Sequence, residues 1–194
     1  MNRLPDTTTW RAALARVLPV HMATRLGVLA VGLLAAVLIG YDPAPSLPAE
    51  WRISANPVLN LLARWDTFWY LDIATHGYRW SGDASVQQNV VFFPALPMLM
   101  RLGGWLLGGH PIIAGALLSL GASLGAFAFI WRLTRERFGE ATATRAVLLL
   151  ATYPFALYFS AVYTESLFLL GSSAAFYEAH RRRWWRVAAW SALV

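Results

Sequence analysis

The residues best suited to chemistry stand together in residues 64–78, which read RWDTFWYLDIATHGY. This stretch sets carboxylates, an arginine and a histidine among indole and phenol rings. Asp66 is the leading candidate for a general base, because a carboxylate within hydrogen-bond reach of a hydroxyl group can take its proton. We expect its side chain to be partly buried among Trp65, Trp69 and Tyr70. The alternative for Asp66 is a helix N-terminal acid or an interfacial anchor.

Three basic side chains in and just after this stretch could hold a phosphate group: Arg64, His76 and Arg79. Arginine suits that task because its planar guanidinium presents a fork of donors. Contact with lipid headgroups is the alternative for all three. Asp72 and His76 are four residues apart, so on a helix they share a face and could pair. The chain has no cysteine and no spacing typical of a metal site, so we predict neither a metal ion nor another cofactor.

A second candidate stands farther along the chain, within the apolar run 146–176. Glu165 lies in its one polar patch, residues 163–166. Ionisable residues within membrane segments are candidates for function, and a simple turn acid among the headgroups is the alternative. Pro154 should kink the helix that leads to this patch, because it cannot donate a hydrogen bond to the carbonyl of Leu150.

Composition assigns these residues to a helical membrane protein. The chain is 58% hydrophobic and 13% charged, with a mean hydropathy of +0.48, well above an ordinary soluble domain. Apolar runs at 26–40, 111–131 and 146–176 approach or exceed the ~20 residues that a helix needs to cross a bilayer. We therefore predict an all-α polytopic membrane protein. Its net charge of +6 fits cytoplasmic loops, so no nucleic-acid partner is expected.

The distribution of arginine predicts the orientation. Residues 1–25 hold four arginines and one aspartate, 132–145 hold four arginines and two glutamates, and 181–186 hold four arginines. Residues 41–90 hold three arginines and five acids. Because positive loops remain in the cytoplasm, we expect the N-terminus to be cytoplasmic. The 41–90 loop and the turn that carries Glu165 then share the extracytoplasmic face.

This orientation dictates the predicted segments. Residues 91–108 cannot be a full crossing, and Arg101 near their middle would cost roughly 2.5–3.5 kcal/mol at the bilayer centre. We therefore predict an interfacial or re-entrant helix there. The run 146–176 must cross twice. The chain 1–194 is thus predicted as one membrane domain, with transmembrane helices at 22–40, 111–131, 146–161 and 166–180, an extracytoplasmic loop at 41–90, a cytoplasmic loop at 132–145 and the start of a fifth helix at 187–194.

Both ends of the chain leave an alternative open. Residues 26–40 could be the core of a signal peptide, although adding residues 22–24 makes the run long enough to span. The apolar run 187–194 is too short to cross, which indicates a truncated chain. Further C-terminal helices or a partner subunit would then complete the protein.

Three blocks of sequence carry a family resemblance. They are residues 64–78, FFPALP at 92–97 and FSAVYTESLF at 159–168. In this order they resemble the PIG-V family of mannosyltransferases, which includes the enzyme that adds the second mannose in GPI-anchor assembly and also bacterial relatives. The resemblance covers roughly residues 62–183. Asp72 is a departure from the resemblance, since it stands at a position where we do not expect the family to require one residue type.

The resemblance implies a GT-C-like bundle of transmembrane helices with a helical extracytoplasmic first loop. Such enzymes take a sugar from a polyprenyl-phosphate carrier and pass it to an acceptor with inversion. Asp66 would be the catalytic base, and Tyr163 and Glu165 would shape the same pocket. The carrier phosphate would be held by Arg64 with His76 or Arg79.

The partners implied are the polyprenyl-phosphate sugar and membrane lipids. All 16 basic residues are arginine, which hints at a GC-rich genome. The expected location is a bacterial plasma membrane, in line with the bacterial relatives in the family that the chain resembles. The alternative class is a non-catalytic membrane protein: a lipid-carrier binder, a transporter, a complex subunit or an inactive truncated product. A transporter would place its ionisable groups at mid-bilayer, whereas the predicted candidates lie at one face.

Overall fold

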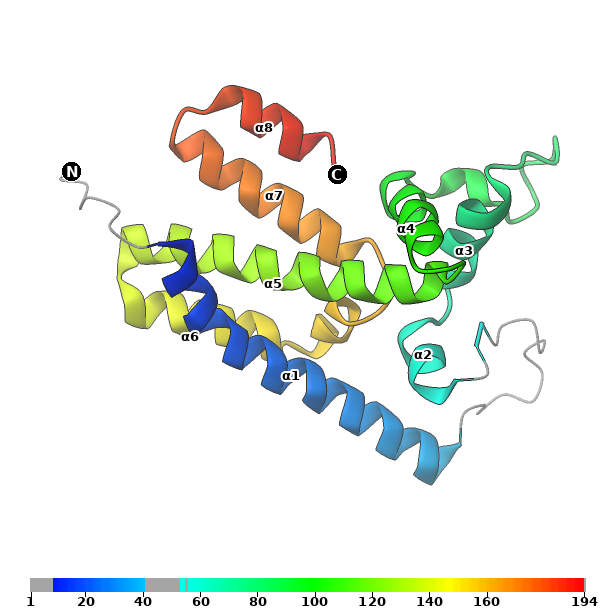
Figure 1. Cartoon of the computed structure of the whole chain (residues 1–194), viewed down its shortest axis with the longest axis horizontal. Helices are drawn as coiled ribbons and strands as arrows, with labels where there is room; N and C mark the ends of the chain where they lie inside the picture. The colour runs from blue at the N-terminus through cyan, green and yellow to red at the C-terminus, as the bar shows by residue number, and fades with distance from the viewer. Residues whose placement is uncertain (1–8, 41–52, 55, 194) are drawn as a thin grey trace. The chain divides into compact units, whose positions relative to one another are not determined.

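The computed structural model describes residues 9–40, 53–54 and 56–193, and its regular elements within those ranges are all helical. In chain order they are α1 (Trp10–Ile39), α2 (Pro57–Leu62), α3 (Thr67–His76), η2 (Asn89–Val91), α4 (Ala95–Leu106), α5 (Pro111–Phe138), α6 (Glu140–Thr152), η3 (Pro154–Phe159), α7 (Glu165–His180) and α8 (Trp184–Ser191) (Figure 1). The described residues fall into two compact units. The first takes its residues from Met1–Val28, Leu120–Phe159 and Glu165–Val194, and the second from Leu29–Ser119 and Ser160–Thr164.

Two of the described helices, α1 and α5, are long and apolar enough to cross a membrane, with 30 and 28 residues. The finding agrees with a helical membrane protein. α1 contains residues 22–39 of the predicted first transmembrane helix, 22–40, and begins earlier, at Trp10. The turns of α1 before residue 22 contain Arg11 and Arg16. Helix can form there because arginine is a good helix former and its charge does not end a helix.

The segment 132–145, predicted as a cytoplasmic loop, is helical over nearly all of its length. α5 runs to Phe138 and α6 begins at Glu140, so only Gly139 separates them, with φ of 85°. Arg135 lies in the last turn of α5, and Glu140 lies in the first turn of α6. Each charge is favourable at its own helix end. Arg135 and Glu140, which belong to the charged segment predicted as a loop, therefore lie at two helix ends.

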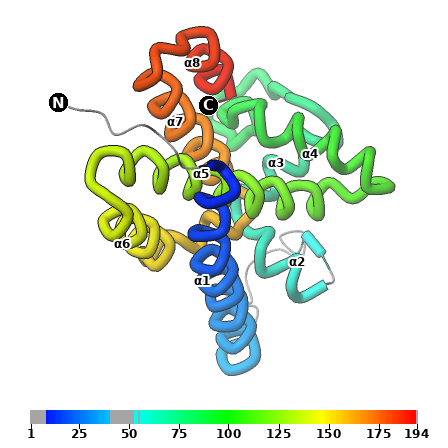
Figure 2. The backbone as a smooth tube through the Cα atoms, turned by 60° about the vertical axis from the view of Figure 1, so that its left-hand side comes forward, coloured from blue at the N-terminus to red at the C-terminus, as the bar shows by residue number. Residues whose placement is uncertain are grey.

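The core of the first unit lies where α6 runs back beside α5 and the start of α1 (Figure 2). Small residues on α1 and α6 let the larger rings of α5 fill the space between them. A buried hydrogen bond of 2.9 Å joins His21 Nε2 of α1 to Ser123 Oγ of α5. The buried cluster comprises Ala13, Val17, Phe127, Trp131, Ala143, Val147 and Ala151.

The kink predicted at Pro154 is instead a complete break, because α6 ends just before it. The helix stops at Thr152, and a 3₁₀ helix, η3, follows, so the predicted helix 146–161 is not continuous. A helix C-terminus leaves carbonyl groups without intrahelical donors. Buried Arg25 of α1 supplies donors here, through Nη2 to Ala151 O at 2.7 Å and Nη1 to Ala156 O.

The second unit contains the predicted 41–90 loop, apart from residues 41–52 and 55, which lie outside the described residues. The short helices α3 and α4 pack against each other (Figures 1 and 2). Arg101 of α4 donates from Nε to Ala74 O at 2.6 Å and from Nη2 to Thr75 O at 3.2 Å. It therefore caps the C-terminus of α3. At 12 residues α4 is about 18 Å long, shorter than a bilayer core.

Candidate functional site

Asp66 stands at the N-terminus of α3, directly after a strained residue. Trp65 has φ of 49°, a left-handed conformation that is rare for a bulky side chain. The Asp66 side chain caps no backbone group of α3 and is exposed. The predicted burial among aromatic rings is therefore wrong. Those rings pack on one another, with Trp69 stacked on Phe92 at 6.0 Å and Tyr70 edge-on to Phe92 at 5.2 Å.

Residues 160–164 lie against the start of α3 and fix its geometry. The Asp66 backbone N–H donates to Tyr163 Oη at 3.1 Å. The buried Thr67 hydroxyl donates to Val162 O at 3.1 Å, and the Val162 N–H donates to Leu62 O at 2.8 Å. Two of the sequence blocks therefore meet, although Asp66 and Tyr163 are 97 positions apart.

A glycine in α5 makes room for this contact. A Cβ atom at Gly115 would lie 2.5 Å from Val162 Cγ1, closer than real Cβ atoms come to a neighbour, and 3.2 Å from Met100 Cγ, which is tighter than most real contacts. Val162 and Met100 are both fully buried. Because neither side chain can retreat into solvent, the close approach of the 160–164 segment depends on the missing side chain.

Asp72 forms a second cluster, in which it is the shared acceptor. Its side chain is only 10% exposed and accepts from Arg79 Nη2 at 2.5 Å, His76 Nδ1 at 2.9 Å and Asn89 Nδ2 at 2.8 Å. Burial raises the pKa of the Asp72 carboxyl, but these three bonds and the Arg79 charge together outweigh it and leave that pKa below its usual 3.8. The predicted pairing of Asp72 with His76 is confirmed.

The predicted phosphate ligands thus differ in their surroundings. His76 and Arg79 each direct one donor to Asp72, and their side chains stay 64% and 65% exposed, which leaves other donors facing outward. Arg64 is half-buried just before the strained turn. Glu165 is the first residue of α7 and belongs to the first unit, where it is half-buried.

Asn89 is a functional candidate that sequence reasoning missed. It is 2% exposed and uses both ends of its amide: Nδ2 donates to Gly77 O at 3.0 Å as well as to Asp72, and Oδ1 accepts from the Arg79 N–H at 3.0 Å. The Tyr78 hydroxyl donates to the Phe92 carbonyl at 2.7 Å. These bonds close residues 77–92 into a loop fastened to α3. The available signal was a polar run, QQN at 87–89, set directly before apolar VVFF.

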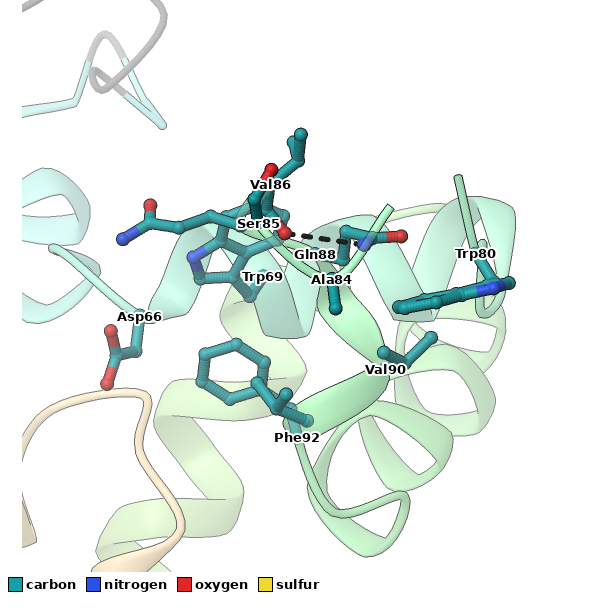
Figure 3. Close-up of a pocket in the computed structure, with 11 residues that line it drawn as sticks. Asp66, Trp69, Trp80, Ala84, Ser85, Val86, Gln88, Val90 and Phe92 are labelled. Carbon is teal, nitrogen blue, oxygen red and sulfur yellow. Dashed lines mark hydrogen bonds between the residues drawn. The ribbon is translucent and has the colours of Figure 1, made fainter. Parts of the chain in front are cut away.

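A pocket of about 460 Å³ opens between α3 and this loop (Figure 3). In that view Asp66 lies at one end, the rings of Trp69 and Phe92 at the middle and Trp80 at the other end. The full lining is Asp66, Trp69, Trp80, Ala84, Ser85, Val86, Gln87, Gln88, Val90, Val91 and Phe92. An exposed carboxylate beside a ring-lined hollow can take a proton from a hydroxyl group of a molecule bound there.

Asp66, which precedes α3, and Asp72, which lies within it, therefore have different surroundings. Asp72 is enclosed by donors of its own chain, whereas Asp66 faces the pocket. Within the ranges that the structure describes, no group of three or more His, Cys, Asp or Glu side chains could hold a metal ion. The Asp66 carboxylate that faces the pocket can accept a proton from a bound hydroxyl group.

Comparison with known proteins shows the family of the chain. No curated protein and no solved structure matches the chain. The family described as mannosyltransferase (PIG-V) matches residues 37–194. That range contains Asp66, the pocket and the 160–164 segment. Because the match covers most of the sequence, the chain belongs to the mannosyltransferase (PIG-V) family.

Proposed function

We propose that this protein is an inverting glycosyltransferase that transfers mannose from a polyprenyl-phosphate carrier to a hydroxyl group of an acceptor. The observation that carries the proposal is the placement of Asp66: its exposed carboxylate lines the pocket, and Tyr163 accepts its backbone N–H. Membership of a mannosyltransferase family supports the reaction class.

The proposed step has one nucleophile and one leaving group. The acceptor oxygen attacks the anomeric carbon of the mannose on the face opposite the phosphate, and the O–H proton passes to the Asp66 carboxylate. The bond between the anomeric carbon and the phosphate oxygen breaks, and its electron pair leaves with polyprenyl phosphate. A base positioned within hydrogen-bond reach typically contributes about 10²–10⁴-fold to such a rate.

Basic residues near α3 would hold the carrier phosphate. Arg64 precedes the strained turn, and His76 and Arg79 keep outward-facing donors beyond those bound to Asp72. Charge-assisted bonds from such donors favour the dianionic leaving group. Glu165 remains a proposed part of the same site. We expect transfer to require no divalent metal.

The proposed setting is a GT-C-like bundle in a bacterial plasma membrane, with the site on the extracytoplasmic face. α1 and α5 are long enough to cross, and a lipid-linked donor would reach the site from within the bilayer. Residues 41–90 carry more acids than arginines, which supports their export.

Donor competition tests this function. Membranes that contain the full-length protein are incubated with an acceptor extract and either labelled polyprenyl-phosphate mannose or a labelled nucleotide-activated mannose. We expect label to reach the product from the lipid donor alone, in the inverted configuration and equally in EDTA. Transfer from the nucleotide donor alone would overturn the proposed donor. Binding of the lipid donor without transfer in any acceptor extract would favour a non-catalytic carrier binder.

A further inference from the structure

The pocket beside Asp66 has a lining with a distinct chemical character. Two indole rings and one phenyl ring, from Trp69, Trp80 and Phe92, form much of it, and Gln87 adds an amide. Asp66 is the one charged residue among its described lining residues. Apolar rings with a few polar groups are typical of a site that binds a small organic ligand and fixes its orientation.

This charge pattern disfavours a phosphate within the pocket. A phosphate would bring a negative charge next to the Asp66 carboxylate, with no basic side chain among the described lining residues to offset the repulsion. A neutral sugar ring suits the lining better. Its C–H face can lie on an indole, and its hydroxyl groups can bond to the amide and the carboxylate.

The loop wall of the pocket is preorganised. Buried Asn89 bonds to Asp72 of α3 at 2.8 Å, to Gly77 O at 3.0 Å and to the Arg79 N–H at 3.0 Å. Gln88, itself a lining residue, accepts from the Ser81 N–H through Oε1 at 2.6 Å. A ligand that enters such a pocket does not have to order the loop first.

The two ends of the pocket determine how a bound ligand lies in it. Asp66 and Trp80 lie at opposite ends of the view in Figure 3, with Trp69 and Phe92 between them. A ring stacked at Trp80 would therefore need a further part of the same molecule to reach the carboxylate. The group that loses a proton to Asp66 belongs to the acceptor, so the molecule that fills the pocket is the acceptor.

We propose that the pocket is the acceptor subsite and that it binds a neutral saccharide of more than one ring. One ring stacks on Trp80, and the reacting hydroxyl lies at Asp66. The donor phosphate then lies outside the pocket. This inference rests on the proposed function and adds to it the acceptor class and its place.

Steady-state kinetics with each substrate varied in turn test the assignment. The variant is Trp80→Ala in the full-length protein, and Trp80 is 59% exposed, so its removal should not unfold the chain. We expect the KM for the acceptor to rise about tenfold, the KM for the donor to stay unchanged, and Trp80→Phe to recover most of the loss. The matched control is Trp105→Ala on α4, which is 76% exposed and does not line the pocket.

Two kinetic results would overturn the assignment. A rise in the donor KM with an unchanged acceptor KM would make the pocket a donor site. Unchanged values for both substrates would remove the pocket from substrate binding altogether.

A binding measurement keeps the inference separate from the transfer reaction. Saturation-transfer NMR of the purified protein with methyl α-mannoside and with a mannobiose should give a stronger signal for the disaccharide, and Trp80→Ala should lose that difference. Saccharide binding without any transfer would contradict the proposed function and leave only a saccharide-binding site at Trp80. Transfer without a Trp80-dependent signal would contradict the subsite and leave the function intact.

Discussion

Replacement of Asp72 by Asn tests whether this buried carboxylate holds the pocket wall. The substitution keeps the shape of the side chain, removes its charge and puts an amide donor where at least one of three donors now binds. The bonds from His76 and Arg79 involve side chains that are about two-thirds exposed, so solvent screening limits them to about 1 kcal/mol together. The bond from Asn89 is buried, and its loss costs about 1–2 kcal/mol.

The sum, about 2–3 kcal/mol, corresponds to a roughly 30–150-fold shift in the local opening equilibrium. Amide hydrogen exchange reports such opening directly. We expect exchange of residues 77–92 to accelerate by that factor in Asp72→Asn, while exchange within α5 stays as in the wild type.

Asp83→Asn is the matched control, because Asp83 lies on the same loop and its side chain accepts from Ser85 of that loop, not from α3. Its effect on exchange should stay within a few-fold. Equal exchange protection in wild type and Asp72→Asn would refute the reasoning. So would an equal loss of protection in the two variants, since loop opening would then not depend on the bonds to α3.

Further predictions concern the contact between α3 and residues 160–164 and the acid response of the loop. Gly115→Ala should lower stability by about 1–3 kcal/mol, measured as a fall in Tm, because its Cβ would meet Val162. Thr67→Val should cost about 1–2 kcal/mol by the same measurement, because it removes the donor to a buried carbonyl. The pKa of Asp72 is lowered in the folded protein, so its contribution to loop stability is complete above about pH 4 and is lost as the pH falls through the folded-state pKa. Amide exchange of the wild-type loop should therefore accelerate in that acidic range. Asp72→Asn should show no such acceleration. Tyr163→Phe should lower kcat about tenfold with little change in either KM, because it releases the Asp66 backbone.

The helical class of this protein could be predicted from sequence because hydrophobicity alone determines it. Apolar runs reveal α1 and α5 directly, and Pro154 marks the end of α6 through its missing donor. The helix ends were predicted less well. Trp10 begins α1 well before the apolar run does, because helix geometry depends on backbone hydrogen bonds that arginine-rich turns form equally well.

Contacts within the candidate site could be predicted from sequence where both residues lie on one helix at a spacing that brings them together. The pair Asp72 and His76, four residues apart, is the example. Contacts across the chain needed the fold. The burial expected for Asp66 is wrong because its aromatic neighbours pack on Phe92 instead. Asn89 shows the same limit, since its role depends on Asp72, 17 positions away, and on a loop whose course no local pattern specifies.

The most direct test of the central claim, that Asp66 is the base, compares kcat for Asp66→Asn and Asp83→Asn at saturating polyprenyl-phosphate mannose and acceptor. Both variants replace an exposed aspartate of the second unit by its isosteric amide. We predict a loss of at least about 10²-fold for Asp66→Asn with normal membrane insertion, and near-normal turnover for Asp83→Asn. Undiminished turnover in Asp66→Asn would contradict the account.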